Sequence, residues 1–159
     1  MEKMKKVSAG ILIYRKIGNK IEVLLAHPGG PFWVKEDVGI WSIPKGEVSD
    51  GEEVLETSKR EFKEETGFIT PRNLIELGSV VQKNGKIIYA WAAEGDFDTK
   101  KSESNTFKME WPPKSGKKID VPEIDRVEYF DVSTAKTKIN PAQIELIDRL
   151  ENILKIDLQ

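Results

Sequence analysis

Hydrophobic residues in the first two thirds of the chain gather into four runs rich in aliphatic and β-branched side chains. Two of them, residues 7–15 and 20–26, are separated by a Gly-Asn pair, and they predict a hairpin or two neighbouring strands. The other two, residues 74–82 and 86–93, flank Asn84-Gly85. A type I′ turn prefers this dipeptide because both central residues take positive φ. The second pair therefore predicts a hairpin with a type I′ turn.

Helical spacing of apolar residues replaces this pattern between about residue 50 and residue 66. Asp50 is the predicted N-cap, Glu53 three residues later completes a capping box, and Gly67 is the predicted residue that ends the helix. A last helix is predicted to begin at Asn140 as its N-cap, with a proline at the first helical position.

The remaining segments connect these elements. Composition predicts a loop over residues 27–39, a short strand over 41–43, irregular structure over 96–105 and a loop over 112–118, with a late strand over 126–130. Strands and helices mix without regular βα alternation. This order favours an α+β fold or an α/β sandwich over a doubly wound parallel sheet.

Composition narrows the possible functions. The 159 residues carry a net charge of −2, so the chain lacks the basic field that DNA- and RNA-wrapping proteins use. It has no cysteine and one histidine, which excludes thiolate and multi-histidine metal sites. Its longest apolar stretch is far shorter than the ~20 residues of a membrane span. We therefore expect one cytoplasmic domain over residues 1–159, monomeric or homodimeric, that binds neither DNA nor membrane.

One face of the first predicted helix is strongly acidic. Glu61, Glu64 and Glu65 share that face, because residues three and four apart are neighbours on a helix. Three carboxylates so close repel one another, and a hard divalent cation such as Mg²⁺ or Mn²⁺ would compensate, because these ions prefer oxygen ligands. The spacing alone is also compatible with a solvated surface, which is the common role of glutamate-rich helix faces.

The wider spacing decides between these alternatives. Residues 46–68 read Gly-x5-Glu-x7-Arg-Glu-Phe-x-Glu-Glu-x-Gly-Phe, which matches every fixed position of the Nudix box. The chain therefore resembles the Nudix hydrolase family. Its segments 110–116 and 122–126 further resemble a bacterial subgroup of predicted nucleoside-polyphosphate pyrophosphohydrolases. The resemblance implies an α/β/α sandwich with a mixed central sheet. It also implies Mg²⁺- or Mn²⁺-dependent attack of water on phosphorus in a nucleoside diphosphate linked to another moiety.

The resemblance also assigns roles to residues of the box. Glu61, Glu64 and Glu65 would be metal ligands, and the backbone carbonyl of Lys45 would be a further one. Arg60 would orient and charge-balance a ligand carboxylate. The remaining box positions would be structural, with a glutamate that ties the loop to the helix and two glycines in tight turns: Glu52, Gly46 and Gly67.

A general base is needed as well, and the family takes it from the box or from a later loop. Glu123 lies just before the late strand, where related enzymes often place such a glutamate. Asp125 and Glu128 are weaker candidates in the same region. An exposed acid of a loop is the alternative interpretation of Glu123.

Candidate substrate contacts lie outside the box. The segment from Trp41 to Gly46 resembles the Trp-x-x-Pro-Lys-Gly sequence of Nudix enzymes that act on dinucleoside polyphosphates, capped RNA ends or diphosphoinositol polyphosphates. The Lys45 ammonium would then contact a phosphate. Phe32 and Trp33 could stack a nucleobase or close the edge of the sandwich, and Tyr89 is a further candidate for stacking. The single histidine, in the same loop, is expected to be structural.

These features favour dinucleoside polyphosphates or nucleoside triphosphates as substrates. Two alternatives remain open at this point: a pyrophosphohydrolase of RNA 5′ ends, and a Nudix-fold module that binds a nucleotide without hydrolysing it.

Overall fold

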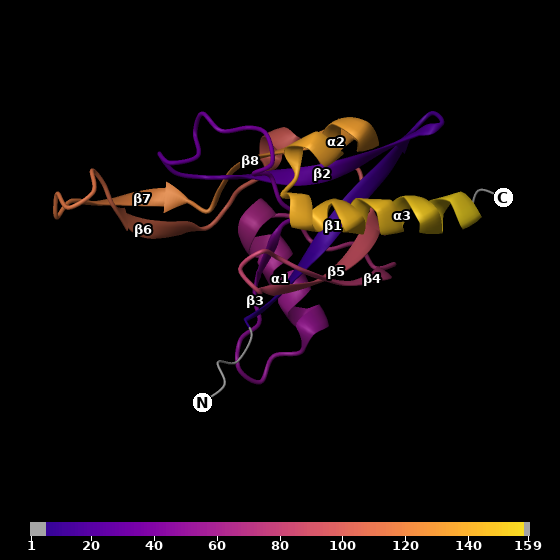
Figure 1. Ribbon diagram of the computed structural model, residues 1–159, viewed down its shortest axis with the longest axis horizontal. Helices are drawn as coiled ribbons and strands as arrows, with labels where there is room; N and C mark the ends of the chain where they lie inside the picture. Colours follow the sequence, from indigo (N-terminus) through magenta and orange to yellow (C-terminus); the bar gives the residue numbers. More distant parts are fainter. Residues whose placement is uncertain (1–5, 158–159) are drawn as a thin grey trace.

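A mixed sheet organises the protein, which we describe over residues 6–157 from a computed structural model. The strands lie in the order β4-β5-β1-β2-β8, with β3 on β1 (Figure 1). β1 runs parallel to β5, and every other pair in this sheet is antiparallel. Its strands are β1 (Val7–Ile17), β2 (Lys20–Pro28), β3 (Lys45–Glu47), β4 (Ile75–Val81), β5 (Ile87–Glu94) and β8 (Ile124–Asp131). The expected α+β fold with a mixed central sheet is confirmed.

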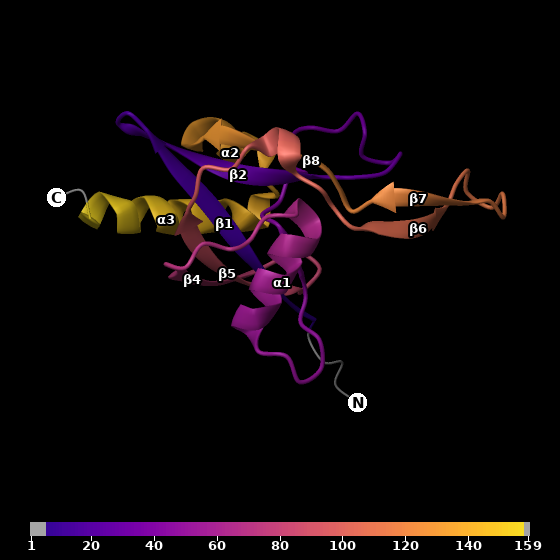
Figure 2. The same cartoon turned by 180° about the vertical axis from the view of Figure 1, so that it is seen from behind.

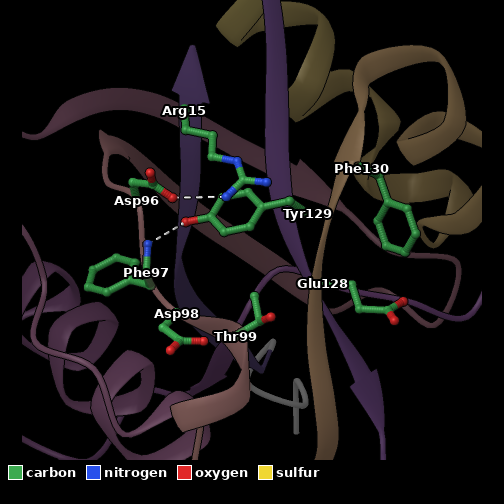
Figure 3. A pocket seen from close by; sticks show the side chains of 8 residues that line it. All are labelled: Arg15, Asp96, Phe97, Asp98, Thr99, Glu128, Tyr129 and Phe130. Carbon is green, nitrogen blue, oxygen red and sulfur yellow. Dashed lines mark hydrogen bonds and ion pairs between the residues drawn. The ribbon is translucent and has the colours of Figure 1, made fainter. Parts of the chain in front are cut away.

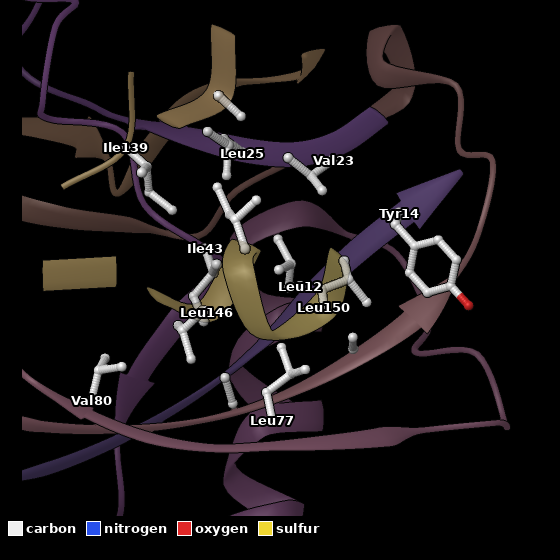
Figure 4. Packing of buried hydrophobic residues seen from close by; sticks show 14 of the residues in the cluster. Leu12, Tyr14, Val23, Leu25, Ile43, Leu77, Val80, Ile139, Leu146 and Leu150 are labelled. Carbon is white, nitrogen blue, oxygen red and sulfur yellow. The ribbon is translucent and has the colours of Figure 1, made fainter. Parts of the chain in front are cut away.

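Alternation along β1 gives the sheet two apolar faces, and each face is covered by a helix. Leu12 lies in the cluster that packs under α3 (Ile144–Asp157), together with Leu146 and Leu150 (Figure 4). Ile11 lies in the opposite cluster, under α1 (Val54–Thr66), with Phe62 of that helix fully buried. Figures 1 and 2 show α3 and α1 on the two opposite sides of the sheet. The result is the three-layer sandwich that the motif implied.

The two predicted hairpins are confirmed, but the turn of the second is not type I′. Only Gly85 has positive φ (87°), and its N–H donates to the carbonyl of Gln82 over 2.8 Å. The Asn84 side chain instead accepts from the N–H of Lys86. This is a wider turn closed by a glycine in the left-handed region, which places one residue more in the loop than the dipeptide predicted.

The start of α1 was predicted wrongly. Asp50 lies in a turn, in which the N–H of Glu52 donates to Ser49, and the first helical bond runs from Thr57 to Glu53. Glu53 is therefore the N-cap, without a side-chain hydrogen bond, because residues 49–52 form a separate loop. The end of α1 is confirmed: Gly67 caps the helix with a φ of 79°.

The last helix begins as predicted. The Asn140 side chain accepts from the N–H of Ala142, and a 3-10 turn, η2 (Pro141–Gln143), leads into α3. Residues 41–43 do not form a strand: Trp41 and Ser42 make isolated bridges to Ile139 and Ala26.

Several elements were not predicted. The irregular segment after β5 contains a 3-10 turn, η1 (Thr99–Lys101), and β8 is followed by α2 (Val132–Lys138). The loop over 112–118 is the tip of a separate hairpin formed by β6 (Thr106–Glu110) and β7 (Lys118–Pro122). This hairpin projects from the sandwich as an arm (Figures 1 and 2). Within residues 6–157, no helix is long and apolar enough to cross a membrane.

We expect Leu146→Ala to lower the free energy of unfolding by about 2–5 kcal/mol, because it leaves a cavity between α3 and the sheet where the native side chain is fully buried. Urea unfolding followed by circular dichroism measures this. Val81→Ala, at a site that is 63% exposed, is the control and should change stability by less than about 0.5 kcal/mol. Equal effects of the two substitutions would contradict the packing described for α3.

Candidate active site

The acidic face of α1 is brought against the shortest strand of the sheet. β3 occupies the edge of β1 next to residues 8–10, while β2 pairs with the far end of β1. Gly46 of β3 lies so close to α1 that a Cβ atom built on it would stand 2.0 Å from Cδ of Glu61. Any side chain at position 46 would occupy the place of the Glu61 carboxylate. The physical requirement for this glycine is therefore room for the Glu61 carboxylate.

The backbone of Lys45 faces the acidic helix. Its N–H donates to Oε1 of Glu65 over 3.1 Å. The bonds from Ile11 to Pro44 and from Val48 to Val7 fix the alternation of the β1–β3 ladder. In an antiparallel ladder the N–H and C=O of one residue point to the same side, so the Lys45 carbonyl also points away from β1, toward Glu65. This orientation is the one that a role as a metal ligand requires.

Arg60 joins the carboxylates of the box. Its Nε and Nη2 bond both oxygens of Glu52 at 2.8 and 2.9 Å. Its Nη1 donates to Glu61 over 2.8 Å and to Glu64 over 3.2 Å. The hydrogen bonds from Arg60 and from Thr57 lower the pKa of Glu52 to about 2. Glu52 thus anchors the guanidinium, which in turn orients two carboxylates of the acidic face.

Two of the glutamates are buried, and burial disfavours the charged form of each. Glu65 is only 7% exposed, and burial raises its pKa to about 8 despite the hydrogen bond from Lys45. Burial, and then the charge of Glu64, raise the pKa of Glu61. The charge of Glu123 acts in the same direction on both Glu61 and Glu65.

The structure brings Glu123 to the box and leaves the other two candidate bases elsewhere. Glu123 lies between β7 and β8, and its N–H donates to the carbonyl of Asn105. Asp125 is bonded to Nδ1 of His27 at 2.9 Å. Glu128 lines a different pocket further along β8. Among the three acids, Glu123 is the one whose charge raises the pKa of the buried glutamates of the box.

Two lysines supply positive charge next to these acids. Burial lowers the pKa of Lys45, and the nearby charge of Lys86 lowers it further. Lys86 also contacts Oε1 of Glu47 at 3.5 Å. The sequence did not single out Lys86, because it approaches the box only through the parallel pairing of β5 with β1, where Ile87 lies beside Val7.

The fit of a divalent cation rests on the chemistry of these donors. Several carboxylates face one guanidinium and one half-buried ammonium, so the site has oxygen donors and unbalanced negative charge, both of which suit Mg²⁺ or Mn²⁺. Among the described residues, however, no three acidic or histidine side chains converge on a common point as a metal-holding group. Arg60 holds Glu61 and Glu64, while Glu65 is turned to the Lys45 backbone. The assignment of metal ligands stays a prediction.

The candidate base-stacking residues differ in exposure. Tyr89 is 37% exposed, and alternation along β5 places it on the same side of the sheet as α1. Phe32 and Trp33 are 57% and 42% exposed. Trp41 was expected to contact substrate, but it is fully buried, and its Nε1 donates to Asp37. Its ring packs in the core and has no surface to offer a ligand.

The histidine has the structural position that was expected. His27 is fully buried, with Nδ1 facing the Asp125 carboxylate and Nε2 at 2.7 Å from the carbonyl of Glu36. Its ring also lies edge-on to Trp41, at 4.9 Å between ring centres. It therefore ties the loop after β2 to the start of β8.

A pocket of about 720 Å³ lies away from the box. Its walls come from the end of β1, from β8 and from the segment after β5, and none of its lining residues belongs to the acidic helix (Figure 3). Arg15 crosses it, 3.8 Å above the ring of Tyr129, and is paired with Asp96. Because its cation is already neutralised, this pocket offers no free charge to a polyphosphate.

Comparison with known proteins identifies relatives of the chain. The family model described as NUDIX domain matches residues 4–150. The asymmetrical bis(5′-nucleosyl)-tetraphosphatase of Rattus norvegicus is 34% identical over 104 residues, which cover 57% of this chain and 67% of the rat protein. The Caenorhabditis elegans protein of the same name is 41% identical over 61 residues, 38% of this chain and 40% of its own length.

Solved structures share the fold at lower identity. The NUDIX domain of Shewanella oneidensis NrtR, in complex with ADP ribose, superposes with a TM-score of 0.66 at 15% identity, covering 96% of this chain and 90% of that one. A C. elegans Ap4A hydrolase binary complex gives a TM-score of 0.64 at 20% identity, over 93% and 98% of the two chains. At these identities the similarity establishes the fold.

We expect Gly46→Ala to lower the free energy of unfolding by about 1–3 kcal/mol, because the added methyl group overlaps the Glu61 carboxylate. A double-mutant cycle measured by urea unfolding tests the cause. In a Glu61→Ala background the same substitution should cost less than half as much. Equal costs in the two backgrounds would show that the strain lies elsewhere.

The raised pKa of Glu65 predicts a pH dependence. The folded protein keeps a proton on this carboxyl up to about pH 8, while the unfolded chain releases it near its ordinary pKa of 4.5, so stability falls as pH rises between these values. We expect Glu65→Gln to remove this fall and to raise the Tm in metal-free buffer, more at pH 8 than at pH 5. Calorimetry measures the Tm of the native protein and of Glu65→Gln as a function of pH. Parallel curves for the two proteins would contradict a pKa raised by burial of Glu65.

Proposed function

The chain belongs to the Nudix hydrolase family, and from this premise we propose that it hydrolyses dinucleoside polyphosphates, with dinucleoside tetraphosphates as the preferred class. The observation that carries the proposal is the intact acidic face of α1, with Arg60 bonded to two of its glutamates and to Glu52 of the preceding loop, and with two lysines beside it. The substrate class is supported by the 34% identity to the rat asymmetrical tetraphosphatase.

Phosphate recognition falls to the cationic side of the site. A chain of four phosphates carries several negative charges, and the carboxylates alone would repel it. The half-buried Lys45, with Lys86 beside it, meets that charge at one border of the acidic face. A phosphate oxygen near Lys45 would also restore the charged form of this ammonium, whose pKa burial lowers.

Glu61, Glu64, Glu65 and the carbonyl of Lys45 are the residues that would hold Mg²⁺ or Mn²⁺. Such an ion, when bound, neutralises non-bridging phosphate oxygens and lowers the pKa of an attacking water. Arg60 keeps Glu61 and Glu64 in orientation, and Glu52 keeps Arg60 in place. Glu65 is nearly buried, whereas the side chain of Glu64 is 39% exposed, so the acidic face has a buried end and a solvent-exposed end.

Proton transfer falls to Glu123. Its carboxylate lies close enough to Glu61 and Glu65 to raise the pKa of both, and no ion pair within residues 6–157 engages it. An unpaired carboxylate at this place can take the proton of a water as the oxygen attacks phosphorus. The electrons of the broken anhydride bond then stay on the oxygen of the departing phosphate chain.

The test is hydrolysis of diadenosine tetraphosphate with Mg²⁺ or Mn²⁺ in ¹⁸O-labelled water. We expect two nucleotide products of unequal phosphate number, with the label in one of them, as separated by chromatography and mass spectrometry. Preferred turnover of nucleoside triphosphates or of 5′-triphosphorylated RNA would overturn the substrate class. Binding of these compounds without any turnover would make the protein a nucleotide-binding module.

The residue assignments have their own expected outcome. Glu64→Gln and Glu123→Gln should each lower kcat by about a hundredfold or more, the usual effect of losing charge stabilisation or a general base. Glu56→Gln is the matched control, because Glu56 lies on the same helix, has a 61% exposed side chain and forms one ion pair within residues 6–157, with Lys59 at 3.7 Å. Near-normal turnover by Glu64→Gln would remove α1 from the chemistry.

A further inference from the structure

The arm formed by β6 and β7 has one polar and one apolar face. Cross-strand neighbours on the polar face include Lys108 and Asp120, whose side chains form an ion pair at 2.9 Å. The apolar face is formed by two cross-strand pairs, Phe107 with Val121 and Met109 with Ile119. Strict alternation of this kind is typical of a hairpin whose apolar face packs against another surface.

Only part of that face is covered within the chain. Val121 is 2% exposed, because the backbone of Gly30 passes so close that a Cβ atom there would stand 3.0 Å from its Cγ1. Phe107 and Ile119 remain 41% and 38% exposed. Near the tip, Trp111 meets Phe32 of the loop after β2 edge-on, at 5.1 Å between ring centres. The arm and this loop together present aromatic rings to solvent.

The base of the arm is attached to the catalytic residues. The N–H of Asn105, just before β6, donates to the carbonyl of Glu64 over 2.8 Å, and the N–H of Glu123, just after β7, donates to Asn105 over 3.0 Å. Phe107 follows Asn105 by two residues, which is about 7 Å along a strand. The exposed apolar face therefore begins beside the acidic helix and leads away from it.

The charge of the arm indicates what the uncovered surface would bind. Lys114, Lys117 and Lys118 form no ion pair with any residue between 6 and 157. Exposed rings combined with unpaired lysines suit a ligand that has a flat base and phosphates. A second copy of the arm would bring three more lysines to the same place, and like charges oppose that contact.

We propose that the apolar face of the arm, with Phe107 and Trp111, binds one nucleoside of a dinucleoside polyphosphate whose phosphates lie at the acidic face of α1. This inference rests on the function proposed above and adds the element that selects substrates with two nucleosides. The arm contributes a stacking surface for the second base, and its lysines attract the polyphosphate toward the site.

The test compares diadenosine tetraphosphate with adenosine 5′-tetraphosphate, which has the same phosphate chain and only one nucleoside. We expect Phe107→Ala to raise the KM for diadenosine tetraphosphate, relative to the KM for adenosine 5′-tetraphosphate, about tenfold. This is the usual cost of removing one stacked ring. Trp111→Leu should act in the same direction. Ile17→Ala, which removes a 51% exposed side chain from the β1–β2 hairpin, is the control and should leave the ratio unchanged.

Binding without turnover separates this proposal from the previous one. In a Glu64→Gln background, we expect calorimetric titration to show that Phe107→Ala raises the dissociation constant of diadenosine tetraphosphate about tenfold relative to that of adenosine 5′-tetraphosphate. If diadenosine tetraphosphate is hydrolysed but Phe107→Ala and Phe107→Leu leave both ratios unchanged, the arm proposal is wrong and the hydrolase assignment stands. If diadenosine tetraphosphate is neither hydrolysed nor bound, the proposed substrate class is wrong, and so is the arm proposal that rests on it.

Sedimentation velocity tests the remaining alternative, that a second copy of the chain covers this face. A native dimer that Phe107→Ala converts to a monomer, with no change in either ratio, would show that the arm joins two copies of the chain, and it would overturn the proposal. Circular dichroism and melting curves of each variant establish that the sandwich remains folded.

Discussion

Arg60 holds together the charges on which the site depends. It meets Glu52 through two nitrogens and shares a third between Glu61 and Glu64, so that a single guanidinium spans the loop before α1 and the acidic face of that helix. Without it, the acidic face would carry mutually repelling carboxylates next to a buried one. The cation thus allows α1 to be acidic and closely packed on β3 at the same time.

Packing opposes the proposed function at Glu65 and Glu61. Both lie where a neutral side chain would be more stable, since burial raises the pKa of each. The fold supports them with Gly46, which leaves room for the Glu61 carboxylate, and with the Lys45 N–H, which bonds Glu65. Local strain of this kind is common at functional sites, which retain residues that packing alone would not select.

Local pattern predicted the features that depend on local residues. The alternating runs gave the hairpins, and the spacing of residues 46–68 identified the acidic helix and its end at Gly67. The errors have other causes. Residues 49–52 form a local turn that moves the start of α1, whereas the burial of Trp41 accompanies its bridge to the distant Ile139. Lys86 reaches the box only through strand pairing. Contacts between distant segments leave little trace in a window of ten residues.

The parallel pairing of β1 with β5 has a consequence for how the protein folds. It joins Val7 to Ile87 and so closes a loop of about eighty residues that contains β3 and the whole of α1. The helix can form early from local contacts, whereas the pairing that brings Lys86 to Lys45 requires a long-range closure. The charge of Lys86 therefore reaches the site late in folding, and until β5 has been synthesised the acidic helix lacks this neighbour.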